Sequence, residues 1–173
     1  MKNFLFCAVM LVATMVNAQV DEIFKHNGEV VKGKVVRNEE YVIVFKYDGE
    51  DAENSMSKYA IEKVVYGKSG RTEEITEKIV VNGELDWEKV VIFEEKDYIA
   101  GLKKVGEVRG KTGLINFQTG NTGDKKAEKK LKMDAAKQNC PFVFMTADKT
   151  TVGANSNALG GSQAIKKGIC YKY

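Results

Sequence analysis

Hydrophobic and polar residues alternate with a period of two along the N-terminal third of the chain, which is typical of half-buried strands. The clearest run is 41–47, whose residues on one face are Tyr41, Ile43, Phe45 and Tyr47. Further runs of strand composition cover 21–26, 29–37 and 58–66. Asn27-Gly28 lies between two of these runs and is a strong signal for a two-residue hairpin. The pattern predicts a small antiparallel barrel of the SH3-like or OB-like kind over residues 19–70.

The pattern changes after residue 75, where one convincing helix appears at 122–138. The strand-like runs around it cover 75–81, 90–93, 98–114, 142–145 and 165–173. Asp124 is the expected N-cap, and Asn139 and Pro141 mark the end of the helix. Its apolar stripe consists of Ala127, Leu131 and Ala135. We therefore predict an α+β sandwich over residues 75–173, with one helix packed on an antiparallel sheet, and a chain that is mainly β and α+β in class.

The segment 1–18 is predicted to be a secretory signal peptide. Met1-Lys2-Asn3 gives a cationic start, residues 4–16 are apolar or small, and Ala18 ends a suitable cleavage site. A membrane anchor is the alternative, but such a run rises only about 20 Å as a helix, whereas a bilayer holds roughly 30 Å of hydrocarbon. Cys7 lies inside the apolar run, where it does not suit lipoprotein processing. We expect a protein secreted across the inner membrane, periplasmic or extracellular, with no lipid anchor and no transmembrane segment.

Export would leave Cys140 and Cys170 in an oxidising compartment. Cys140 leads into the run 142–145, and Cys170 lies in the last run of the chain. If these runs pair antiparallel about residue 155, the two cysteines lie nearly opposite each other, ~4.5–5.5 Å apart at Cα, which a disulfide can bridge. A Cys140–Cys170 disulfide and two buried free thiols both remain consistent with the sequence.

Charge is unevenly distributed along the chain, although the formal net charge is only +3. Residues 19–100 carry seven more acidic than basic residues, and residues 101–173 carry nine more basic than acidic ones. The predicted helix has a broad basic side made of Lys125, Lys126, Lys129, Lys130, Lys132 and Lys137. Such a side most often only solvates a surface helix, and the alternative is adsorption to anionic lipid headgroups or polysaccharide. Nucleic acid is disfavoured as a partner, because these lysines lack interleaved aromatic residues.

Candidate catalytic and ligand-binding motifs fail when their spacing is tested. The run from Gly106 to Thr112 has three residues between its glycines where a P-loop needs four, so we interpret it as strand. The acidic run Asp48, Glu50, Asp51 and Glu53 matches no EF-hand loop. His26 is the only possible imidazole base, and beside a hairpin turn it is expected to be an exposed polar residue. The sequence therefore predicts no catalytic, cofactor-binding or metal-binding residue and no cofactor.

A series of short motifs runs through both parts of the chain. In the first part it comprises Asp21-Glu22-Ile23, Asn27-Gly28, Val31-Lys32-Gly33-Lys34-Val35, Phe45-Lys46-Tyr47, Ile61 and Val64-Val65-Tyr66-Gly67. In the second part it comprises Ala135-Ala136-Lys137 with Pro141, and Gly168-Ile169-Cys170-Tyr171. With these motifs the chain resembles uncharacterised secreted proteins of Bacteroidota that have an N-terminal SH3-like small β-barrel and a C-terminal α+β domain. The loop 48–54 departs from the usual Asn-Pro-Asp-Gly-Pro of that family, and the resemblance implies no established activity.

These features together predict an exported cell-envelope protein that serves as a non-enzymatic binding or structural module for an envelope protein or polymer. The alternative is an adaptor with peripheral membrane contact, which adsorbs to anionic envelope lipid or polysaccharide through the Lys-rich helix 124–138. A hydrolase is the third possibility. A binding module is expected to show a concave aromatic or apolar groove on the barrel.

Overall fold

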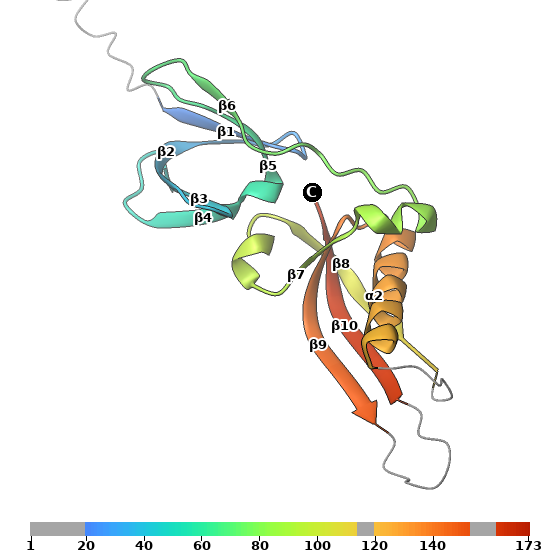
Figure 1. Cartoon of the computed structure of the whole chain (residues 1–173). Helices are drawn as coiled ribbons and strands as arrows, with labels where there is room; N and C mark the ends of the chain where they lie inside the picture. The colour runs from blue at the N-terminus through green and yellow to red at the C-terminus, as the bar shows by residue number, and fades with distance from the viewer. Residues whose placement is uncertain (1–19, 114–119, 153–161) are drawn as a thin grey trace, which may run out of the picture.

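The computed structural model describes residues 20–113, 120–152 and 162–173, which form two β-sheets and one long helix (Figure 1). The described chain is therefore mainly β, with the α+β arrangement that the sequence predicted. The predicted signal peptide 1–18 and Cys7 lie outside the described residues. Within the described part, no helix is both long enough and apolar enough to cross a bilayer.

The first sheet has six strands in the order β4-β3-β2-β1-β5-β6, all antiparallel to their neighbours. Their bounds are β1 Asp21–Lys25, β2 Val30–Asn38, β3 Val42–Tyr47, β4 Glu53–Ser57, β5 Ile61–Val65 and β6 Thr72–Glu74, with a short 3₁₀ helix η1 at Lys58–Ala60. The predicted hairpin at Asn27-Gly28 is present, but its loop has three residues, because Lys25 N donates to Glu29 O and Gly28 takes a φ of 90°. No strand was predicted over β4, because its sequence is polar and only Met56 and Ser57 of its side chains are buried.

This sheet is strongly curved, and with η1 it encloses one core of Ile23, Ile43, Phe45, Met56, Ala60, Ile61 and Val64. It does not close into the predicted barrel, because no backbone pairing joins the outer strands β4 and β6 in the described chain. The nearest approach to closure is a side-chain bond, in which Asn38 Nδ2 at the end of β2 donates to Glu73 Oε1 on β6 at 3.0 Å. The first half of the molecule is thus an open, curled sheet.

The second sheet has the order β7-β9-β10-β8, with β7 at Val91–Phe93, β8 at Lys103–Lys111, β9 at Phe142–Val152 and β10 at Ser162–Lys172. The strand at Gly106–Thr112, preferred to a P-loop, is confirmed as β8 up to Lys111. Two expectations are wrong: residues 75–81 form no strand, and β7 pairs parallel to β9 in a sheet predicted to be antiparallel. Short 3₁₀ helices, η2 at Glu84–Lys89 and η3 at Lys96–Ile99, flank β7.

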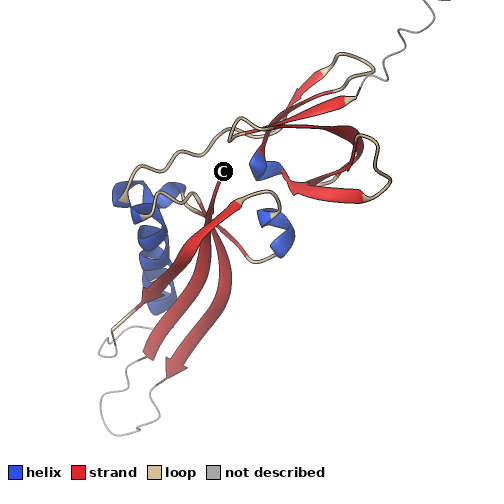
Figure 2. Cartoon of the chain, turned by 180° about the vertical axis from the view of Figure 1, so that it is seen from behind, coloured by secondary structure: helices blue, strands red, loops and turns tan. Residues whose placement is uncertain are grey.

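The helix α2, Gly120–Lys137, lies along one face of the second sheet (Figures 1 and 2). Its predicted stripe of Ala127, Leu131 and Ala135 is fully buried. Asn139 has a φ of 53° after the last turn, which confirms the predicted left-handed end. The helix begins before Asp124, so the prediction of Asp124 as N-cap is wrong.

A seam of aromatic rings joins the two sheets. Tyr59 from η1 lies 4.9 Å from Phe93 and 5.7 Å from Phe142 between ring centroids, and Tyr173 continues the series 5.3 Å from Phe142. His26 meets Tyr173 at 4.9 Å and is only 8% exposed, so the expectation of an exposed turn histidine is wrong. The two halves are therefore held by an apolar contact, and the chain end at Tyr173 lies between them (Figure 1).

Candidate binding site

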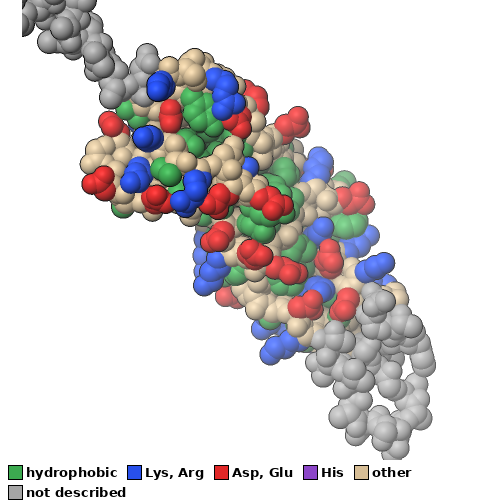
Figure 3. All heavy atoms as spheres, turned by 60° about the vertical axis from the view of Figure 1, so that its left-hand side comes forward, with side chains coloured by type: hydrophobic (Ala, Val, Ile, Leu, Met, Phe, Trp, Pro, Cys, Tyr) green, Lys and Arg blue, Asp and Glu red, His purple; other side chains and the backbone are tan. Residues whose placement is uncertain are grey.

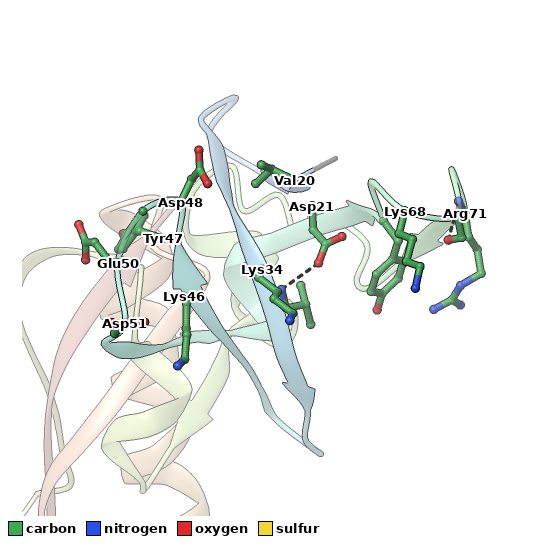
Figure 4. Close-up of a pocket in the computed structure, with 14 residues that line it drawn as sticks. Val20, Asp21, Lys34, Lys46, Tyr47, Asp48, Glu50, Asp51, Lys68 and Arg71 are labelled. Atoms are coloured by element: carbon green, nitrogen blue, oxygen red, sulfur yellow. Dashed lines mark hydrogen bonds between the residues drawn. The ribbon is translucent and has the colours of Figure 1, made fainter. Parts of the chain in front are cut away.

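A hollow of about 960 Å³ opens at the end of the first sheet where β1 begins and where β3 and β5 end. Its lining residues come from the start of β1, the middle of β2, the end of β3 with its following loop, and the turn between β5 and β6 (Figure 4). We call this hollow the trough. A binding module was expected to have a concave aromatic or apolar groove on the first half of the chain, and the trough is the candidate for that groove.

Asp21 creates the trough by ending the pairing of β1 with both its neighbours. Its Oδ2 accepts from Val35 N on β2 at 2.9 Å, and its Oδ1 accepts from Gly67 N after β5 at 2.9 Å. One side chain thus satisfies two backbone amides that a longer β1 would have bonded. Beyond it, no strand among the described residues pairs with this side of β2 or with the β5–β6 turn.

The inner wall of the trough is apolar and aromatic, formed by Val35, Tyr47 and Tyr66. Tyr47 is 40% exposed and packs edge-on against Phe45 of the core at 5.0 Å. Tyr66 donates its hydroxyl to Glu73 Oε2 at 2.9 Å, and burial together with this bond raises the pKa of the phenol. The trough therefore has one exposed ring, that of Tyr47, and one ring, that of Tyr66, whose hydroxyl is already hydrogen-bonded.

Two lysines that also line the hollow lie opposite each other at the neighbouring positions, where their side chains alternate with those of Val35 and Tyr47 along β2 and β3. Lys34 on β2 pairs directly with Lys46 on β3, and directly opposed residues of an antiparallel pair have Cβ atoms about 4.5–5.5 Å apart. Glu53 faces Lys46 from β4, but it is engaged with Arg37 at 3.2 Å. Neither lysine has an ion-pair partner among the described residues.

The register of this pair is fixed by the preceding residue of β2. A Cβ at Gly33 would lie 2.2 Å from the backbone oxygen of Lys46, so only glycine lets the two strands approach here. The like charges are thus placed by the backbone, and like charges directly opposite each other destabilise a sheet.

The two ends of the trough carry opposite charge. The loop after β3 contributes Asp48, Glu50 and Asp51, and the turn before β6 contributes Lys68 and Arg71 (Figure 4). Arg71 is partly neutralised, because it pairs with Glu73 at 2.9 Å and lies 4.4 Å over the ring of Tyr66. The lysine pair lies between these ends.

Sequence patterns missed most of this site. The sequence pattern placed Tyr47 only on one face of a predicted strand, and Tyr66, Lys34 and Lys46 were only part of a motif. The acidic residues of the loop were considered for calcium alone, and no cluster of three potential metal ligands occurs among the residues described. Period-two alternation places Lys34 and Lys46 on one face of a sheet, but only the register of β2 on β3 makes them neighbours.

The predicted basic side of α2 proves to be largely engaged. Lys130 donates to Lys111 O at 3.0 Å, Lys137 pairs with Glu84 at 3.3 Å, and Lys129 lies 4.6 Å over the ring of Trp87. Lys132 is 3.7 Å from Glu128, while Lys125 and Lys126 are exposed. The Lys137–Glu84 pair also links the basic part of the chain to the acidic part. On the face seen in Figure 3, acidic and basic side chains are interspersed.

Cys140 and Cys170 are buried free thiols in the structure, so of the two alternatives left open by the sequence the disulfide is not formed there. Cys170 pairs with Val143 across the sheet, not with Cys140, because Cys140 precedes β9 in the turn after α2. The two sulfurs nevertheless meet in the second core, 2.9 Å apart. Cys140 donates to Cys170 Sγ, which lowers the pKa of Cys170, and the same contact with burial raises the pKa of Cys140.

Comparison of the chain with protein-family models, with curated proteins and with solved structures gives no match.

Proposed function

We propose that this protein is a non-enzymatic binding module of the cell envelope and that the trough is where its ligand docks. The observation that carries the proposal is the unpartnered Lys34–Lys46 pair beside the exposed ring of Tyr47. Two opposed ammonium groups cost stability unless a ligand neutralises them. A repulsion between like charges that nothing in the described chain neutralises is the kind of unfavourable local feature that is expected at functional sites.

The finer architecture is part of the proposal. We regard the curled first sheet as an opened small barrel of the SH3-like kind, followed by a separate α+β unit at 75–173. Its curvature and the Asn38–Glu73 bond between β2 and β6 support this view. The resemblance to secreted proteins of Bacteroidota and the export signal at 1–18 support a periplasmic or extracellular location, with an envelope protein or polymer as partner.

The position of the only imidazole supports a role without catalysis. His26 follows the end of β1, whereas the trough lies where β1 begins. Its Nε2 is bonded to Thr76 Oγ1 at 3.0 Å, and its ring packs on Tyr173. A hydrolase of the trough would have to work without an imidazole.

Adsorption through α2 to anionic lipid or polysaccharide is the weaker alternative. Four of its six lysines already contact Lys111, Trp87, Glu128 or Glu84. Only Lys125 and Lys126 at the first turns are left for such a surface. Peripheral membrane contact of this kind would be lost at high salt.

The proposal is tested by mapping probe binding on the isotope-labelled exported protein by NMR. The probes are a pool of synthetic octapeptides of mixed sequence and a pool of neutral and anionic oligosaccharides. We expect amide shifts to gather at residues 34–35, 46–51 and 66–71. Shifts only on α2 would favour adsorption, and an absence of shifts at the trough with either pool would overturn the proposal.

Two tyrosines give a matched pair of variants for this mapping. Tyr41 and Tyr47 are both 40% exposed, but only Tyr47 lines the trough. We expect Tyr47→Ala to weaken binding of the active pool by up to about tenfold, because a stacking contact on a ring is worth about 0.5–1.5 kcal/mol. Tyr41→Ala should leave the same binding unchanged.

A further inference from the structure

The charges of the trough are arranged in a fixed order along its length. The acidic loop residues Asp48, Glu50 and Asp51 lie at one end, the Lys34–Lys46 pair lies in the middle, and Lys68 lies toward the other end (Figure 4). Asp21 also lies in the middle and keeps its negative charge when it accepts from two neutral backbone amides, but the two lysines there outnumber it. The trough therefore presents a negative end and a positive middle to any ligand.

A ligand of a single charge sign fits this order poorly. A polyanion would gain at the lysine pair but would be repelled by the three carboxylates, and a polycation would meet the opposite problem. Anionic polysaccharide, nucleic acid and a surface of anionic lipid headgroups are polyanions and therefore fit poorly. A peptide can carry both signs within a few residues.

The backbone beside the trough also suits an extended peptide. The pairing of β1 with β2 stops at Asp21 opposite Gly33, while β2 continues to Asn38 with no strand of the described chain paired to it on that side. Val35 N on this edge is already bonded to Asp21, and beyond it an extended segment can align with the strand through main-chain hydrogen bonds. The apolar wall of Val35 and Tyr47 then offers contact to its side chains.

We propose that the trough binds an extended peptide segment of mixed charge, with a carboxylate between Lys34 and Lys46 and a cationic group against the acidic loop. This inference rests on the proposed function, since it names the ligand class of the same site. A carboxylate placed between two ammonium groups accepts charge-assisted bonds from both. The cationic group neutralises the loop carboxylates, which lie within the same hollow.

Binding is measured by calorimetry with four synthetic decapeptides of the same backbone: one with two lysines and two glutamates in separate halves, one with four glutamates, one with four lysines and one neutral. We expect the mixed peptide to bind at least tenfold more tightly than the other three. The double variant Lys34→Glu/Lys46→Glu should lower its affinity at least tenfold. Lys103→Glu/Lys104→Glu on β8 changes net charge equally outside the trough and should have little effect.

Reversal of the acidic loop gives the sharper test. In Asp48→Lys/Asp51→Lys the all-glutamate peptide should become the tighter ligand and the mixed peptide should lose affinity. Equal binding of the mixed and all-glutamate peptides to the unchanged protein would overturn the inference. If oligosaccharides shift the trough amides and no peptide does, the peptide inference fails while the binding site stands. If no probe reaches the trough, both fail.

Discussion

At the scale of single residues, polar side chains end strands and helices or link one element to another. Asp21 accepts from two strands at once, and Asn139 ends α2 with a positive φ. His26 lies in the seam, where Thr76 Oγ1 is within 2.8 Å of Ile61 O and 3.0 Å of His26 Nε2. Because the Thr76 hydroxyl has one proton, donation to Ile61 O requires His26 Nε2 to donate to it. The histidine is thus held as a structural group.

His26 should make the stability of the fold depend on pH. Burial lowers its pKa below the ordinary value, and Lys78 lowers it further while Glu62 opposes. The unfolded chain therefore binds a proton more readily than the folded one, so stability is present above a pH of about 6.5 and is lost as the pH falls toward the folded pKa. We expect the free energy of unfolding to fall by up to about 1.4 kcal/mol per pH unit in this window.

Urea unfolding at pH 7.5 and 5.5 measures this loss. In His26→Gln the part due to imidazole should vanish, and because His26 is the only histidine of the chain, no other imidazole can replace it. An equal loss of stability in both proteins over this window would show that other groups cause it.

At the scale of elements, α2 seals the free edge of β8. Asp134 Oδ2 accepts from Arg109 N at 2.9 Å, Lys130 donates to Lys111 O, and Gln138 donates to Glu107 O at 3.5 Å. These helix residues are four apart and rise about 6 Å each step, close to the roughly 6.7 Å of two strand residues. The helix side chains therefore follow the strand and protect an edge that could otherwise pair with another chain.

The close approach of α2 to β8 depends on Gly110. A Cβ there would lie 1.8 Å from Ala127 O and 2.7 Å from Leu131 N, which are backbone atoms of the helix. We expect Gly110→Ala to lower the free energy of unfolding by about 2 kcal/mol or more, because the helix must move. Thermal and urea unfolding measure the change.

Gly123 within α2 is the matched control for Gly110. Its Cβ would meet only Ala164 Cβ, at an ordinary 3.8 Å. Gly123→Ala should therefore be neutral or stabilise by up to about 1 kcal/mol through helix propensity. Equal effects of the two substitutions would contradict the close packing of helix and strand.

The thiols of Cys140 and Cys170 connect the end of α2 to β10. Treatment with oxidised glutathione should join them, as the two thiols give up two protons and two electrons and one glutathione disulfide becomes two thiols. The loop so closed should raise the free energy of unfolding by about 2–4 kcal/mol. Intact mass and alkylation of the thiols measure the reaction, and Cys170→Ser, which cannot form the disulfide, is the control. If the two thiols fail to oxidise even in urea that partly unfolds the protein, the expected proximity is contradicted.

At the scale of the whole molecule, two cores are coupled by the aromatic seam. One core lies inside the first sheet and the other between α2 and the second sheet. Ser57 N donates to Ala100 O, so a backbone hydrogen bond also crosses between the halves. We expect the halves to unfold together.

Tyr59→Ala should weaken this coupling, because the ring contacts Phe93 and Phe142 of the other half. We expect a loss of about 2–3 kcal/mol. The fluorescence of Trp87, the only tryptophan, reports the second core, and far-UV circular dichroism reports both sheets. The two unfolding curves should coincide in the unchanged protein and separate in the variant. Leu85→Ala removes a side chain that is 95% exposed, so it should neither lower the free energy of unfolding nor separate the two curves.

Sequence by itself determined the elements whose cause is local. The alternation at 41–47, the turn at Gly28, the stripe Ala127-Leu131-Ala135 and the helix end at Asn139 were all predictable. In each, the deciding residues lie within a few positions of each other, where period and backbone preference act.

Only the tertiary structure decided the features that depend on which strands meet. The parallel pairing of β7, the polar strand β4, the meeting of Cys140 with Cys170 from a turn, and the trough with its Lys34–Lys46 pair all depend on register between distant segments. Local pattern fixes which face a side chain takes, but the partner on that face is set by burial of the two cores as a whole. The candidate binding site is such a product of register, and for this reason its residues are scattered from 20 to 71 in the chain.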